Sequence, residues 1–359
     1  MAILNDLTDP LVIKILITLP VKSLMQCICV CKSWYNLVSD PHFISLHLSL
    51  KSADEKEYLV IRLLRGLYLT DYFSFRCNET LVEKLKVNCP IPELGWGCSI
   101  AGCCNGLLLI VNIDHSDLYL WNPSLGKIKP LPGVRGTYNK SKFRLEALGL
   151  AFLPDVRDYK VIRILNFLSD DFSVAEIYSL RTDCWRRIET PVERLIPRFD
   201  CPLSAAFVNP FFYWAGAENH NNIVSFNLEC ETFKATSLPD AFLYYGELGG
   251  HLVVFQESLY LFTFRSGEGN SLRMLKENDG SGMSFLKICS FPSGFPAGFM
   301  KNGDVIVVDM ENKVSLRDPR NVSSPRNTEY ELCWGLIYNY SPSLALLDKE
   351  LEGISQTIL

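Results

Sequence analysis

Residues 19–34 read LPVKSLMQCICVCKSW, and this stretch decides how the chain is organised. It follows a short amphipathic segment, Leu7 to Thr18, at the N-terminal end of a chain of 359 residues. The apolar residues of both segments recur at helical spacing, whereas the rest of the chain consists of short β-type runs. The sequence therefore predicts a small all-α module ahead of a much larger all-β domain.

Aspartate and proline mark where the predicted helices begin and end. Asp9 is suited to cap the first helix, and Pro10 fits its first position, where a missing N–H costs nothing. Pro20 ends that helix, and Asp40-Pro41 repeats the same start signal. We expect three to four short helices within residues 1–50.

The helical module carries more apolar surface than it can cover by itself. Fifty residues in short helices are too few to bury all of their large apolar side chains. Each such side chain left exposed forfeits roughly 1.5–3 kcal/mol of burial. Either the module packs on the β domain as a cap, or a partner protein covers it, and the residues alone leave both arrangements open.

Beyond a polar joint at residues 51–57, β-branched and aromatic runs alternate with turn residues, which is typical of an all-β domain. Asn105-Gly106 and Asn302-Gly303 are tight-turn signals ahead of apolar runs. The runs fall into groups of about four strands, each group roughly 40–50 residues long, as in propeller blades. Three groups have four predicted strands each: Cys98–Ala101, Leu107–Val111, Leu118–Asn122 and Ile128–Leu131; Leu148–Leu153, Tyr159–Ile164, Ala175–Leu180 and Trp185–Glu189; Ala205–Val208, Phe211–Ala215, Ile223–Asn227 and Thr232–Thr236.

A six-bladed β-propeller accounts for the remaining runs. Two further groups lie at Leu243–Ile288 and Ala297–Leu332. Two packed β-sheets are the alternative, because strand spacing does not separate the two architectures. In the propeller, the sixth blade takes three strands from the start of the β domain and a closing strand from its end: Tyr58–Leu64, Leu67–Phe75, Leu81–Val87 and Ser343–Leu347.

The composition argues against several classes of protein. A formal charge of −5 and a pI near 5.7, with no basic stripe, argue against nucleic-acid binding. The sequence contains no run of about 18 apolar residues, so no membrane span is predicted. Asp6 and Asp9 precede the N-terminal apolar stretch and Lys14 interrupts it, which is unlike a signal peptide. The 13 cysteines include no CxxC pair, so we interpret them as reduced, buried residues. These features predict a protein of the cytoplasm, the nucleus or both.

The sequence contains no set of residues with catalytic or metal-binding spacing. The five histidines are scattered, and Asp114-His115 are neighbours on a predicted turn. Ser266-Gly267-Glu268-Gly269 lacks the GKS/T continuation of a phosphate-binding loop. Trp121 and Trp185 are interpreted as repeated anchors of the blade cores. We therefore expect a protein that is not an enzyme and has no metal or cofactor.

The N-terminal segments resemble the F-box, the module that docks substrate receptors onto the Skp-type adaptor of SCF (Skp–cullin–F-box) ubiquitin ligases. The match runs in order through LPVKSL at residues 19–24, VCKSW at residues 30–34, and then Pro41 and Phe43. The resemblance implies that eleven positions face the adaptor: Leu7, Leu11, Ile15, Leu16, Leu19, Pro20, Val21, Leu24, Val30, Cys31 and Trp34.

Three residues depart from the F-box pattern. Thr8 stands where the family usually has proline, Pro10 where it has an acid, and Lys14 where it has glutamate. An exposed Lys14 would weaken adaptor docking by up to about 1 kcal/mol. These departures keep a second interpretation open, in which a propeller scaffold protein carries a degenerate F-box that no longer docks.

The β domain is similar to the plant F-box-associated, kelch-like domain, as in S-locus F-box-like proteins. The pattern decays near Leu272, where Arg273 replaces a tryptophan, so a flexible insertion is expected within Gly267–Gly282. Before that point five motifs match: GCCNGL at 102–107, LWNPSLGK at 120–127, DYKV at 158–161, IYSL at 177–180 with Trp185, and FNL at 226–228 with Phe233.

The two resemblances together imply the substrate-recognition subunit of an SCF E3 ubiquitin ligase, with catalysis supplied by other subunits. Its domains would be an F-box at 1–50, a polar joint at 51–57, a substrate-binding propeller at 58–348 and a C-terminal tail at 349–359. The implied partners are the Skp-type adaptor, through it a cullin, and an unidentified target protein on the propeller face. We expect target specificity in loops such as Val134–Lys142, Leu165–Ser173 and Glu218–Asn222.

Overall fold

The computed structural model describes fourteen segments of the chain. They are residues 9–50, 57–65, 70–91, 98–112, 117–133, 143–167, 172–189, 203–215, 222–237, 251–263, 270–278, 282–291, 294–331 and 337–346. Residues 1–8, most of the polar joint and the C-terminal tail lie outside these segments. Within them, no helix combines the length and the apolar character needed to cross a membrane.

Four short helices form the N-terminal module, as predicted. Asp40 caps α4 with its side chain, because Asp40 Oδ1 accepts hydrogen bonds from the backbone N–H of His42 (2.8 Å) and Phe43 (3.2 Å). Pro41 occupies the first turn of that helix. The bounds are α1 Asp9–Leu16, α2 Val21–Cys27, α3 Lys32–Val38 and α4 Pro41–Ser49.

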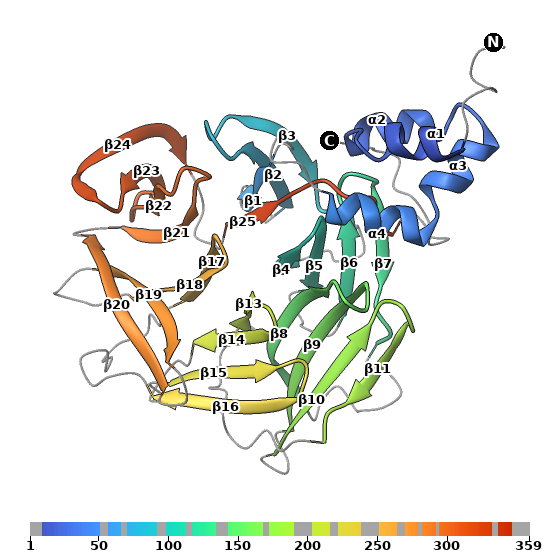
Figure 1. Ribbon diagram of the computed structural model, residues 1–359. Helices are drawn as coiled ribbons and strands as arrows, with labels where there is room; N and C mark the ends of the chain where they lie inside the picture. The colour runs from blue at the N-terminus through green and yellow to red at the C-terminus, as the bar shows by residue number, and fades with distance from the viewer. Residues whose placement is uncertain are drawn as a thin grey trace.

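The rest of the described chain forms six sheets arranged in a ring, so the predicted six-bladed propeller is confirmed (Figure 1). Their strands pair antiparallel, except that the short strand β12 pairs parallel with β8. We number the blades along the chain, and the sheet that contains strands from both ends of the β domain is blade 6. Blade 1 is β4 Cys98–Cys104, β5 Leu107–Asn112, β6 Leu118–Asn122 and β7 Lys127–Pro130; blade 2 is β8 Phe143–Leu153, β9 Asp158–Phe167, β10 Phe172–Ser179 and β11 Cys184–Arg187, with β12 Leu203–Ser204; blade 3 is β13 Ala206–Val208, β14 Phe211–Ala215, β15 Asn222–Asn227 and β16 Thr232–Ser237; blade 4 is β17 His251–Phe255, β18 Ser258–Thr263, β19 Asn270–Asn278 and β20 Gly282–Phe291; blade 5 is β21 Phe295–Phe299, β22 Val305–Val308, β23 Lys313–Asp318 and β24 Asn321–Glu331; blade 6 is β25 Tyr338–Tyr340, β1 Tyr58–Arg65, β2 Thr70–Cys77 and β3 Glu83–Asn88.

Apolar side chains fill the spaces between neighbouring blades. Leu109 of blade 1 and Val161 of blade 2 belong to one buried cluster, and Phe73 of blade 6 packs on Trp121 of blade 1 at 5.1 Å between ring centroids. The indole of Trp121 is 1% exposed, which confirms its interpretation as a core anchor. Inner strands such as β5, β9 and β22 are buried on both faces, which is why they read as nearly continuous apolar runs, whereas outer strands such as β16 are largely exposed.

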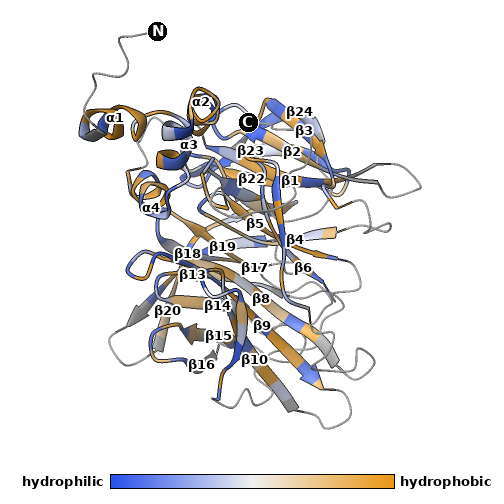
Figure 2. Ribbon diagram, turned by 90° about the vertical axis from the view of Figure 1, so that its right-hand side faces the viewer, coloured by the Kyte–Doolittle hydropathy of each residue, from blue (hydrophilic) through white to orange (hydrophobic). Residues whose placement is uncertain are grey.

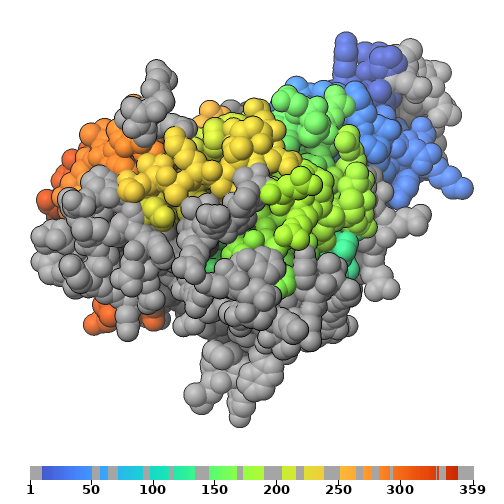
Figure 3. Space-filling model, turned by 90° about the horizontal axis from the view of Figure 1, so that it is seen from below, coloured from blue at the N-terminus to red at the C-terminus, as the bar shows by residue number. Residues whose placement is uncertain are grey.

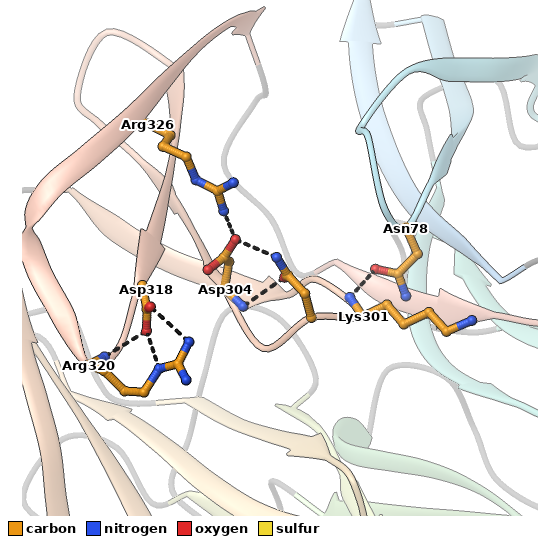
Figure 4. A network of polar contacts seen from close by, with 7 residues as sticks. Asn78, Lys301, Asp304, Asp318, Arg320 and Arg326 are labelled. Atoms are coloured by element: carbon orange, nitrogen blue, oxygen red, sulfur yellow. Dashed lines mark hydrogen bonds and ion pairs between the residues drawn. The ribbon is translucent and has the colours of Figure 1, made fainter.

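Blade 6 closes the ring by joining the two ends of the β domain. β25 pairs antiparallel with β1, placing Tyr340 opposite Tyr58. Asn78 in the β2–β3 turn strengthens this closure: its Nδ2 donates to Asn339 Oδ1 (3.0 Å), and its Oδ1 accepts from the Lys301 backbone N–H of blade 5 (2.9 Å; Figure 4). In the same network Arg326 pairs with Asp304, and Arg320 with Asp318.

One of the predicted strands was misplaced, and the expected insertion is only partly described. The closing strand is Tyr338–Tyr340, whereas Ser343–Leu347 was expected. Residues 343–346 form no strand, because the carbonyl oxygens of Ser343 and Ala345 accept hydrogen bonds from Asn122 Nδ2 (2.9 Å and 2.7 Å). Of the insertion expected within Gly267–Gly282, residues 270–278 form β19 and Gly282 begins β20, and these two strands pair with each other. Residues 267–269 and 279–281 lie outside the described segments.

The two faces of the propeller disc differ in their connections. The helices lie at one face, which we call the helical face (Figure 2). Short turns join strands there, such as 105–106, 123–126 and 256–257. The connections at the opposite face include the longest of the domain, 131–142, 188–202 and 238–250. All three loops that we expected to set specificity connect strand ends at this opposite face, although most of their residues lie outside the described segments.

Candidate docking surfaces on the helices and the propeller

The helical module and the propeller share one apolar core. Phe43 of α4 lies in a cluster with Leu125 from the β6–β7 turn and Leu344 from the segment that follows β25. Leu48, also on α4, packs against the core between blades 1 and 2. Figure 3 shows the helices beside the blades coloured green and away from those coloured orange. The module is therefore fixed on one edge of the disc.

The structure places the predicted adaptor-facing residues in three environments. Leu11, Ile15 and Val30 are exposed, at 48%, 51% and 62% of their surface. Among the other eight positions, Pro20 and Cys31 are also exposed, and Leu19 and Trp34 are half-buried. Leu16, Val21 and Leu24 are buried in the module's own core, and Leu7 lies outside the described segments.

Packing of the helices on the propeller leaves part of their apolar surface exposed. Among the described residues, ten large apolar side chains are exposed, and five of them lie within the helical segment. Leu11 and Ile15 are four residues apart on α1, so both point to the same side of that helix. Tyr35 on α3, 49% exposed, was not among the predicted positions. This concentration of exposed apolar side chains is typical of a protein-binding surface.

Two of the three departures from the F-box pattern can be located. Lys14 is exposed in the last turn of α1, where a positive charge interacts favourably with the helix dipole. Pro10 is exposed within the first turn, so it leaves the helix intact. Thr8 lies outside the described segments. The charge at Lys14 therefore stands beside the exposed Leu11 and Ile15 rather than inside a core.

A groove of about 370 Å³ lies between α4 and the propeller, beside their packed contact. Ile44 and Leu48 line its helical side, and Phe152, Tyr159 and Leu346 line its propeller side. Both oxygens of the buried Asp158 carboxylate in this groove have partners within the protein. Oδ2 accepts a hydrogen bond from Ser179 Oγ (2.5 Å) and pairs with Lys160 (2.7 Å), and Oδ1 accepts from the Arg181 backbone N–H (2.9 Å). Asp158 of the DYKV motif is thus a structural residue that ties the β8–β9 and β10–β11 turns together.

Two titratable residues of blade 4 have pKa values that burial shifts away from reactivity at neutral pH. Burial lowers the pKa of His251 to about 4 and raises the pKa of the Cys289 thiol to about 11. A thiol with a raised pKa is a poor nucleophile, and an imidazole with so low a pKa is a weak base. Within the described segments, no three His, Cys, Asp or Glu side chains are grouped as they would be around a metal ion.

Comparison with known proteins agrees with this two-part architecture. A family model described as the F-box associated beta propeller domain matches residues 71–317, and one described as the F-box domain matches residues 4–46. F-box protein CPR1 of Arabidopsis thaliana is 27% identical over 252 residues, which cover 63% of this chain and 59% of that protein. The Arabidopsis thaliana F-box protein At3g17480 is 26% identical over 338 residues, covering 87% of this chain and 85% of that protein.

This chain covers less than two thirds of several curated relatives. This chain spans about half to three fifths of the curated relatives At3g16210 (61%), At1g33530 (51%) and CPR1 (59%). Among solved structures, TolB from Acinetobacter baumannii has a TM-score of 0.47 at 14% identity, over 82% of this chain and 68% of that one.

The matches to both family models assign this helical module and its six-bladed propeller to the F-box class. The chain belongs to the family of F-box proteins with an F-box associated beta propeller domain, and it is homologous to Arabidopsis F-box proteins.

Proposed function

We propose that this chain is the substrate-recognition subunit of an SCF E3 ubiquitin ligase, acting in the cytoplasm, the nucleus or both. The observation that carries the proposal is the exposed apolar surface of an F-box that is already packed on its own propeller. In this role the chain supplies no bond chemistry. It raises the effective concentration of target lysines near the ubiquitin carrier held by the other subunits.

The adaptor contact is proposed at the eleven positions that the F-box pattern implies, with the exposed members making first contact. Leu11, Ile15 and Val30 are the large apolar members that no neighbouring side chain covers well. Their burial against a Skp-type adaptor would contribute roughly 1.5–3 kcal/mol per side chain when complete. Leu16, Val21 and Leu24 support this surface from inside the module.

The target protein is proposed to bind at the opposite face of the propeller. The helical face is partly occupied by the F-box itself, since Leu125 and Leu344 are buried under the helices. The long connections at the opposite face offer variable surface on a rigid ring, which is where binding residues usually lie in such folds. We assign the F-box to residues 1–50 and the substrate-binding propeller to residues 58–348, with 51–57 as the joint and 349–359 as the tail.

Adaptor binding tests this proposal directly. The full chain and its Ile15→Asp variant are mixed with a Skp-type adaptor, and binding is measured by co-purification and titration calorimetry. Leu50→Asp is the matched control, because Leu50 is equally exposed (54%) at the end of α4 and is not an adaptor position. We expect loss of binding for Ile15→Asp alone. Equal binding by all three proteins, with unchanged circular dichroism, would disprove the docking role.

Lys14 favours a second candidate function, a propeller scaffold protein that no longer docks. Its exposed positive charge adjoins Ile15, where the family carries glutamate. If the wild-type chain fails to bind the adaptor while Lys14→Glu gains binding, the scaffold function is correct. If both bind, and differ by no more than about 1 kcal/mol, the charge is only a modulator of docking.

A further inference from the structure

The Sγ atoms of two cysteines at the junction of blades 6 and 1 lie close to the distance at which a disulfide forms. The Sγ atoms of Cys89, just after β3, and Cys98, the first residue of β4, lie 3.0 Å apart. A disulfide needs an S–S distance of about 2.0 Å, so a side-chain adjustment of about 1 Å separates the two states. Sequence spacing does not predict this pair, because the two residues are nine positions apart and outside any CxxC motif.

The two thiols differ in their access to solvent. Cys98 is completely buried in the cluster between blades 6 and 1, beside Phe73 and Trp121. Cys89 is only partly buried at the edge of the same cluster. A small oxidant can therefore reach Cys89 first, and the thiol of Cys98 lies next to it inside the core. An accessible thiol with a neighbouring resolving thiol is the arrangement found in redox-sensitive cysteine pairs.

From this geometry we propose that Cys89 and Cys98 form a reversible disulfide when the protein meets a peroxide. The peroxide O–O bond breaks as Cys89 Sγ takes one oxygen and becomes a sulfenic acid, releasing one water. Cys98 Sγ then attacks Cys89 Sγ; the new S–S bond forms, and the S–O bond breaks. The hydroxide that leaves takes the thiol proton of Cys98 as a second water. The two sulfurs are oxidised, and the peroxide is reduced to two waters.

The bond would link the outer strand of one blade to the inner strand of the next at the opposite face. β3 ends at that face, and β4 begins there. The connection 90–97 would become a closed loop, which restricts the unfolded chain more than the folded one. Oxidation should therefore stabilise the junction between blades 6 and 1. Docking of the helices on a partner is not required for this chemistry.

Mass spectrometry of the full-length protein tests the pair. Reduced protein is treated with hydrogen peroxide, unfolded in N-ethylmaleimide, and cut with Glu-C protease, which cleaves after Glu93 and so separates Cys89 from Cys98. We expect the two peptides to stay joined until dithiothreitol is added, with a loss of about 2 Da relative to the reduced pair. Cys98→Ser must abolish the link, whereas Cys103→Ser, on the same peptide as Cys98, must leave it in place.

A second readout covers the case in which Cys98→Ser folds poorly. The midpoint of thermal unfolding of the wild-type protein should rise on peroxide treatment and return with dithiothreitol, and Cys89→Ser should show no rise. Recovery of Cys89 and Cys98 as maleimide adducts, while the exposed Cys29 and Cys31 are oxidised, would overturn the proposal. A link from Cys89 to Cys103 or Cys104 would overturn it as well.

Discussion

Asn122 offers the sharpest test of how the propeller is closed. Its side chain is completely buried, and its Nδ2 donates to the carbonyl oxygens of Ser343 (2.9 Å) and Ala345 (2.7 Å). Its Oδ1 accepts from the Ser124 backbone N–H (3.0 Å). Asn122→Asp keeps the acceptor and the shape but replaces the donor with an oxygen that faces two carbonyls. Leaving each carbonyl unsatisfied costs about 1–3 kcal/mol, so we expect a loss of about 2–6 kcal/mol in the free energy of unfolding.

Asn227 provides the matched control for this substitution. It ends the third strand of blade 3, as Asn122 ends the third strand of blade 1. Its Oδ1 accepts from the backbone N–H groups of Glu229 (2.7 Å) and Cys230 (3.3 Å), and an aspartate would keep both bonds. We therefore expect Asn227→Asp to change stability by less than about 0.5 kcal/mol.

Urea unfolding followed by tryptophan fluorescence measures both variants at neutral pH. The deficit of Asn122→Asp should shrink at acidic pH, because a protonated carboxyl can donate one of the two lost hydrogen bonds. Equal stability of the two variants would refute the idea that Asn122 holds the segment after β25 in place. So would a large, pH-independent loss in both.

Three further predictions concern single sites in the propeller. Glu176→Gln should destabilise the protein in urea unfolding, by up to about 3–5 kcal/mol, since it removes the carboxylate that pairs with the buried Arg163 guanidinium at 2.6 Å; the double variant with Arg163→Met should recover much of that loss. Gly106→Ala should lower the midpoint of thermal unfolding, because a Cβ at this positive φ (80°) would overlap the Ser343 side chain and lie 2.8 Å from the Ser341 carbonyl oxygen; an unchanged midpoint would contradict the close approach. His251 is neutral in the folded state, and its pKa of about 4 lies below the unfolded value of 6.5, so stability should be full above pH 6.5 and fall as the pH drops toward 4; His251→Phe should make this fall smaller, and an identical pH profile would argue against burial as its cause.

Much of the fold was predictable because burial and strand alternation leave a direct pattern in the sequence. The apolar runs of blades 1 and 2 predicted strands within a few residues of β4–β11, and Asp40-Pro41 marked the start of α4 correctly. The closing strand was misplaced because Ser343–Leu347 is apolar for another reason. Leu344 is buried under the helices and Ala345 in the core between blades 1 and 2, so burial there does not imply strand pairing.

The candidate surfaces were only partly predictable. A motif predicts which residues face a partner across a family, but it does not separate exposed Ile15 from buried Leu24 in the free chain. Tyr35 was missed because its position lies outside the motif, although its exposure is comparable to that of Ile15. The Cys89–Cys98 contact depends on how β3 and β4 meet in space, and nothing in local sequence spacing encodes that meeting.

The burial of Leu344 under the helices links the beginning of the chain to its end. During synthesis the N-terminal module emerges first, yet its core stays incomplete until residues 338–346 have left the ribosome and β25 has paired with β1. A prematurely terminated chain would therefore lack both the closed ring and part of the support beneath its helices.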